Sequence, residues 1–148
     1  MKLDQAFSPL NQVFIDTAPI VYYVERHPQY FPLVEAIFQR LTAGSFQAIT
    51  SPITLAECLV LPIRNGLPKL QADFISVITS GINTSFIPVD ALASQKAAEL
   101  RVKYGFKLPD ALQLGTAIAA GSDAFLTNDE QLKQVTELQV LVLKELEL

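Results

Sequence analysis

The chain has 148 residues, of which half are apolar and 18% are charged, with a net charge of −4 and a pI near 4.9. This length predicts a single domain over residues 1–148 with a substantial core. The acidic balance excludes a protein that coats nucleic acid through a basic surface, and no apolar stretch approaches the roughly 20 residues that span a bilayer.

The only cysteine, Cys58, excludes a disulfide within the chain and fits a reducing compartment. The first residues contain no apolar core of the signal-peptide type. Together these features predict a cytoplasmic protein with no membrane partner. The low charge and the mean hydropathy of +0.31 further predict that some apolar surface is buried against a second copy of the chain.

The first half of the chain alternates short strands with helices. Apolar residues recur at helical spacing between positions 30 and 42, and Gly44 ends that helix. Ser51 and Pro52 are typical of an N-cap and a first helical position, and Pro62 is expected to kink or end the helix that follows. We predict strands over residues 13–15 and 46–50, and helices over 18–25, 30–42, 51–61 and 67–79.

The second half continues the alternation. Residues 109–120 are nearly all small or apolar, which predicts a central buried helix ended by Gly121. Within it, Gly115 costs about 1 kcal/mol relative to alanine, and it would allow close packing of a neighbouring helix. We predict strands over residues 84–87, 124–126 and 138–143, and helices over 90–104, 109–120 and 129–135.

Short strands separated by helices predict an α/β fold, a three-layer αβα sandwich around a central five-stranded parallel sheet. In such open sheets, ligands bind beyond the carboxyl ends of the strands. Asp16 and Asp129 stand at the ends of predicted strands, and Glu57 and Asp110 lie in the helices after residue 51 and residue 108. We therefore expect these four acids to reach one crevice.

Clustered carboxylates repel one another, so a shared crevice needs a compensating charge. Mg²⁺ and Mn²⁺ prefer oxygen ligands and would supply that charge. A cation held by carboxylates activates water and neutralises charge on a phosphate ester, which points to metal-dependent chemistry on such esters. Thr127, Asn128 and Thr17 are placed to hydrogen-bond a ligand carboxylate or a phosphate. Lys103 and Lys107 are the favoured phosphate contacts.

Four short motifs in this order resemble the signatures of the PIN domain family over most of the chain. They are FIDT at 14–17, TLAE at 54–57, LPDAL at 108–112 and LTND at 126–129. The length and the single domain look most like the toxin-type, VapC-like ribonucleases of toxin–antitoxin pairs. One departure is Gly115, where the family usually has an alanine-rich run.

The resemblance implies a Mg²⁺- or Mn²⁺-dependent endoribonuclease that leaves 5′-phosphate and 3′-hydroxyl ends on its RNA substrate. Asp16, Glu57 and Asp110 match the three core metal-site acids, Asp129 matches the more variable fourth, and Thr127 matches the neighbouring hydroxyl residue. The resemblance also implies a homodimer and a small antitoxin protein as partners. We expect the dimer to form through the helix over 67–79 or the helix over 30–42.

Several alternatives stay open at this point. Read one at a time, Asp16 and Asp129 could be ordinary helix caps, and Asp110 a first-turn acid facing the helix dipole. A phospho-acceptor receiver domain and an aspartyl phosphatase are disfavoured, because the lysine of the first and the Asp-x-Asp motif of the second are missing. The remaining rival is a PIN fold without catalytic activity that acts as an RNA- or protein-binding partner.

Overall fold

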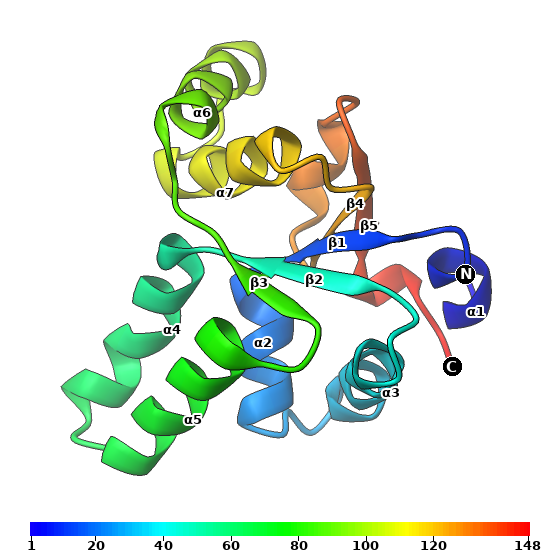
Figure 1. Ribbon diagram of the computed structural model, residues 1–148, viewed down its shortest axis with the longest axis vertical. Helices are drawn as coiled ribbons and strands as arrows, with labels where there is room; N and C mark the ends of the chain where they lie inside the picture. Colours follow the sequence, from blue (N-terminus) through cyan, green and yellow to red (C-terminus); the bar gives the residue numbers. More distant parts are fainter.

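A computed structural model describes all residues from 1 to 148 and shows one five-stranded sheet between two layers of helices (Figure 1). Every strand pair is parallel, and the strand order is β3-β2-β1-β4-β5. The predicted α/β architecture with five parallel strands is confirmed. The strands are β1 (Gln12–Ile15), β2 (Gln47–Thr50), β3 (Thr84–Phe86), β4 (Ala124–Thr127) and β5 (Gln139–Val142).

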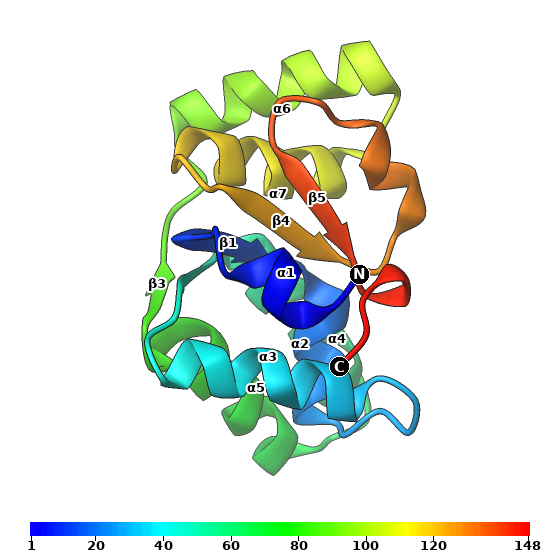
Figure 2. The ribbon, with the colours of Figure 1, turned by 90° about the vertical axis from the view of Figure 1, so that its right-hand side faces the viewer.

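One helical layer covers each face of the sheet, and Figures 1 and 2 show α6 and α7 on one face and α2, α3 and α5 on the other. The helices are α1 (Leu3–Phe7), α2 (Thr17–Val24), α3 (Phe31–Thr42), α4 (Pro52–Arg64), α5 (Pro68–Ser80), α6 (Ala91–Tyr104) and α7 (Leu108–Ala119), with the 3₁₀ helices η1 (Glu130–Gln134) and η2 (Leu143–Glu145).

Strand β1 shows why this sequence needs both layers. Val13, Phe14 and Ile15 are all buried, although successive strand residues point to opposite faces. Val13 and Ile15 join the core beneath α2, α3 and α5. Phe14 faces α7 and stacks on Phe125 of β4, with ring centroids 5.2 Å apart. The continuous apolar run therefore reflects a strand buried on both faces, as parallel sheets require.

Helices α6 and α7 approach each other very closely at Gly115. A Cβ on Gly115 would lie 2.5 Å from the Ala93 carbonyl oxygen and 2.7 Å from the Ala97 nitrogen, both in α6. Ala93 and Ala97 are themselves small and buried. The expectation that Gly115 permits close helix packing is confirmed.

Two features differ from the sequence expectations. The short helix α1 was not predicted, because five residues are too few to show a helical period; its Leu3 and Phe7 are buried in the larger core. Helix α4 continues past Pro62 to Arg64. The Pro62 ring is buried, and the proline falls within the last turn, so little helix remains for it to disrupt.

None of the helices has the length and apolarity that crossing a bilayer requires.

We predict that Gly115→Ala destabilises the protein even though alanine is the better helix former. The added methyl group meets the backbone of α6 and not a flexible side chain, so the two helices must separate. Such overpacking costs about 1–3 kcal/mol, more than the gain of about 1 kcal/mol in helix propensity. Chemical denaturation measures the change; Val102→Ala, at a position of α6 that is 89% exposed, serves as the control and should leave the stability unchanged or slightly raised.

Candidate active site

Asp16 directly follows β1, the central strand of the sheet, which has β2 on one side and β4 on the other. Its backbone N–H donates to the Leu126 carbonyl of β4 at 2.9 Å, which continues the β1–β4 ladder by one residue. Asp16 is also the N-cap of α2, and its Oδ1 accepts the Thr17 N–H at 2.8 Å. The helix-cap reading of Asp16 is therefore correct, and the same geometry places the carboxylate in the crevice where ligands bind in such sheets.

Thr127 fixes the second oxygen of this carboxylate. It ends β4, next to Asp16, and its fully buried hydroxyl donates to Asp16 Oδ2 at 2.7 Å. The same Oγ1 accepts the backbone N–H of Asp129 at 3.1 Å. Thr127 therefore contacts the Asp16 carboxylate, as predicted, and also binds the backbone of Asp129.

Glu57 reaches the same crevice from the second turn of α4. Ser51 caps this helix by accepting the Ile53 N–H, as predicted, and so sets its direction. Glu57 Oε1 accepts the Thr17 hydroxyl at 2.8 Å, which ties α4 to the start of α2. The Glu57 side chain is exposed, so the apolar residues beside it in the sequence do not enclose it.

Gln113 links the two carboxylates, and the sequence did not reveal this role. Its amide Nε2 lies 3.1 Å from Asp16 Oδ1, 3.3 Å from Thr17 Oγ1 and 3.4 Å from Glu57 Oε1. The residue is fully buried in α7. A glutamine on the buried face of an otherwise small and apolar helix was the available signal, because a buried polar residue needs partners.

Asp110 and Asp129 complete the group of acids. Burial raises the pKa of Asp110, and the nearby charges of Asp129 and Glu57 raise it further, while Lys107 lowers it. Burial raises the pKa of Asp16 to about 6 in spite of its hydrogen bonds, and the charges of Asp110 and Glu57 add to this rise. These mutual effects indicate that the four predicted acids lie near one another, and two of them, Asp16 and Asp129, line one cleft. Asp129 itself is exposed and caps η1 by accepting the Gln131 N–H.

A cleft of about 390 Å³ opens beside Asp16, Thr127 and Asp129. Lys144 is the only basic residue that lines it, and the sequence had not singled out this lysine. Its backbone N–H donates to Asn128 Oδ1 at 3.1 Å, and its ammonium lies 3.8 Å from Glu130. The Asn128 side chain therefore bonds to Lys144 and to the Tyr22 hydroxyl, and not to any of the four carboxylates.

The donor set of this crevice fits a hard divalent cation, because it consists of carboxylate oxygens whose charges disfavour one another. No three acidic, histidine or cysteine side chains lie close enough to form a metal site as they stand. The oxygens of Asp16 and Glu57 accept hydrogen bonds from Thr17, Thr127 and Gln113 instead. The residues that would hold the cation are Asp16, Glu57, Asp110 and Asp129.

The other residues considered from the sequence fall outside this chemistry or at its border. Lys107 lies near Asp110, whereas the Lys103 ammonium lies 3.4 Å from Glu137 and over the Tyr104 ring. Cys58 is buried, and this burial, with the neighbouring charge of Glu57, raises the pKa of its thiol to about 12. Cys58 is thus a residue of the larger core, and so little thiolate forms at neutral pH that it does not serve as a nucleophile.

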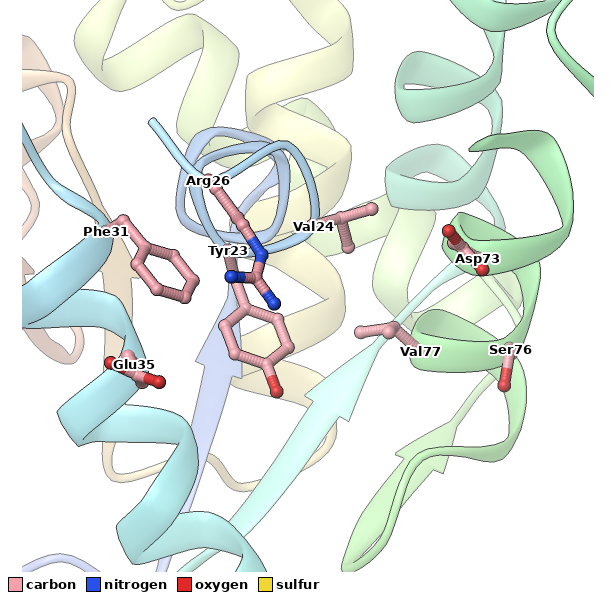
Figure 3. Close-up of a pocket in the computed structure, with 8 residues that line it drawn as sticks. All are labelled: Tyr23, Val24, Arg26, Phe31, Glu35, Asp73, Ser76 and Val77. Carbon is pink, nitrogen blue, oxygen red and sulfur yellow. The ribbon is translucent and has the colours of Figure 1, made fainter. Parts of the chain in front are cut away.

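A second hollow, of about 310 Å³, lies between α2, α3 and α5 and contains none of the four acids. Figure 3 shows the Arg26 side chain close to the rings of Tyr23 and Phe31, with Glu35 and Asp73 on opposite sides of the hollow. The Arg26 guanidinium lies 5.3 Å from the centre of the Phe31 ring. This hollow is a surface separate from the acidic crevice.

A parallel sheet with acids at the carboxyl ends of its central strands defines an α/β protein with a candidate ligand site there. A sequence comparison identifies its family. The family pattern of the PIN domain matches residues 13–138. The chain belongs to the PIN domain family. No curated protein sequence matches the chain.

Solved structures of toxin–antitoxin proteins share this fold. VapBC2 from Rickettsia felis, bound to a promoter DNA fragment, is similar with a TM-score of 0.70 and 18% identity over 88% of this chain and 98% of that chain. A toxin–antitoxin complex from Klebsiella pneumoniae gives a TM-score of 0.68 and 17% identity over 88% and 97%. The sarcin–ricin-loop-cleaving toxin VapC20 from Mycobacterium tuberculosis gives 0.63 and 16% over 76% and 86%.

We predict that, without divalent cations, the stability of the protein falls as the pH rises from about 4 to about 6. The pKa of Asp16 is about 6 in the folded protein and near 3.8 in the unfolded chain. Between about pH 4 and pH 6 the folded state therefore binds more protons than the unfolded state, and its stability falls as the pH rises. The loss should be on the order of 2 kcal/mol, since one pKa unit corresponds to about 1.4 kcal/mol.

The measurement is urea denaturation in EDTA at several pH values, for the wild type and for Asp16→Asn. The asparagine variant lacks this titration, so it should gain on the wild type as the pH rises towards 7. Parallel pH profiles of the two proteins would contradict the prediction.

Proposed function

We propose that the protein is a cytoplasmic endoribonuclease that uses Mg²⁺ or Mn²⁺, and that it is the toxin of a toxin–antitoxin pair. The observation that carries this proposal is the convergence of Asp16, Glu57, Asp110 and Asp129, from four separate elements, on one crevice of a PIN domain. A divalent cation bound there would supply an activated water and would neutralise charge on the phosphate.

The residues of the chain itself would bind the cation and orient the substrate. Thr127 and Thr17 hold oxygens of Asp16 and Glu57, so the two carboxylates have defined directions before any ligand arrives. Asp110, in the first turn of α7, and Asp129, the N-cap of η1, would supply the other two carboxylates. Such prior ordering lowers the cost of binding and of orienting a substrate.

The proposed substrate is RNA, which needs positive charge near an acidic crevice. Lys144 lines the cleft beside Asp16 and Asp129, and Lys107 lies near Asp110. These two lysines are the proposed phosphate contacts. The similar protein VapC20 is a toxin that cleaves the sarcin–ricin loop, which supports RNA as the substrate class.

The proposed partners are a small antitoxin protein and a second copy of the chain. The similar structures from Rickettsia felis and Klebsiella pneumoniae are described as toxin–antitoxin assemblies, which supports the antitoxin. Helices α4 and α5 leave large apolar side chains in solvent, among them Leu61 and Ile63 at 59% exposure and Ile75 at 43%. Such a surface supports burial against another protein.

We predict that the purified protein cleaves single-stranded RNA with Mg²⁺ or Mn²⁺ and not with EDTA. Asp16→Asn should lower the rate by more than about 100-fold, since changes to residues outside the ligand shell alone cost 10–100-fold. The measurement is cleavage of a labelled oligonucleotide, followed by mapping of the cut ends, which we expect to carry 5′-phosphate and 3′-hydroxyl groups.

The matched control is Asp73→Asn, which removes an exposed carboxylate of α5 that pairs with Lys69. It should leave cleavage unchanged. Undiminished cleavage by Asp16→Asn would refute the site assignment. Cation-dependent binding of RNA without any cleavage would instead favour a PIN fold that acts as a binding partner.

We predict a mass in solution of twice the 16.3 kDa of one chain. The exposed apolar side chains of α4 and α5 would be buried between the two copies, so Ile75→Asp should yield monomers. Val102→Asp, which places the same charge on α6, should remain dimeric. Light scattering at micromolar concentration gives the mass, and a monomeric wild type would contradict the proposal.

A further inference from the structure

The amide of Gln113 is held in one orientation by two buried hydroxyl groups. Its Oε1 accepts the Thr54 hydroxyl at 2.7 Å and the Ser51 hydroxyl at 3.2 Å, and both of these residues are fully buried. Exchanging the amide oxygen and nitrogen would direct the oxygen at the carboxylates and the NH₂ group at the hydroxyls. The polar surroundings therefore fix the NH₂ group towards Asp16 and Glu57.

That NH₂ group faces more acceptors than it has hydrogens. Its two hydrogens meet Asp16 Oδ1, Thr17 Oγ1 and Glu57 Oε1 at 3.1–3.4 Å. Thr17 in turn donates its own hydrogen to Glu57 at 2.8 Å. The positive end of the amide dipole is thus fixed between two carboxylates whose like charges repel each other.

We infer that Gln113 is a positioning residue whose amide serves as the internal counter-charge of the Asp16 and Glu57 carboxylates when no cation is bound. This inference rests on the proposed cation site. The amide binds Asp16 and Glu57, two of the residues that would hold the cation, so its contribution should be largest in the cation-free protein. A glutamine that only filled the core would contribute equally with and without a cation.

The test compares melting temperatures in EDTA and in saturating Mn²⁺ for the wild type, Gln113→Met and Thr116→Val. Methionine keeps the length of glutamine and removes both the NH₂ donor and the acceptor of the Thr54 and Ser51 hydroxyls. Only the loss of the donor should depend on the cation, because the two hydroxyls do not face the carboxylates. Thr116 is buried in the same helix, one turn away, and its hydroxyl bonds only to the Leu112 carbonyl, so its valine variant reports general damage to α7.

We expect Gln113→Met to melt about 5 °C below the wild type in EDTA, because a buried carboxylate loses its donor. In Mn²⁺ this difference should shrink to less than half, whereas the difference for Thr116→Val should stay constant. An equal or larger Gln113→Met difference in Mn²⁺ would overturn the inference. A wild type whose melting temperature does not respond to Mn²⁺ would refute the proposed cation site instead.

A second comparison needs no cation. Glu57→Gln removes one of the two charges, so Gln113→Met should cost less in the Glu57→Gln background than in the wild type when both are measured in EDTA. Equal costs in the two backgrounds would overturn the inference. If Gln113→Met alone does not fold, folding of the double variant supports the inference, and failure of the double variant to fold overturns it.

Discussion

Several carboxylates repel one another across a single crevice, and the structure around them is organised to tolerate this repulsion. Donors from separate elements reach the oxygens of Asp16 and Glu57: the Thr17 hydroxyl from α2, the Thr127 hydroxyl from β4 and the Gln113 amide from α7. The Thr127 hydroxyl accepts the backbone N–H of Asp129, and the Gln113 amide accepts two buried hydroxyls, so both donors are fixed. The crevice is therefore ordered before any cation or substrate enters it, although burial still raises the pKa of Asp16 to about 6.

The parallel sheet brings residues from distant parts of the chain to one edge. Parallel strands end at the same edge, and β1 and β4 are neighbours at the place where the chain connections diverge. The helix that carries Asp110 and Gln113 must lie close to this edge to bring them in. It does so while α6 packs against its outer side, which only a residue without a side chain at position 115 allows.

The proposed RNA substrate is a polyanion, and the chain itself has a net charge of −4. The cleft beside Asp16 contains one basic residue, Lys144, whose backbone N–H donates to Asn128. Local charge at the crevice, together with a cation, matters more for phosphate binding than the total charge of the chain, because exposed charges are screened within about 10 Å.

The sequence by itself determined the strands, most helices, the parallel sheet and the four acids, since buried strands and caps such as Ser51 leave local patterns. It also indicated the close packing at Gly115. Only the tertiary structure decided which donors meet the acids: Gln113 lies 97 residues from Asp16 and Lys144 lies 16 residues from Asn128, and no local period relates such pairs. The exposure of Glu57 was decided there too, because side-chain burial depends on what the whole fold packs around a helix.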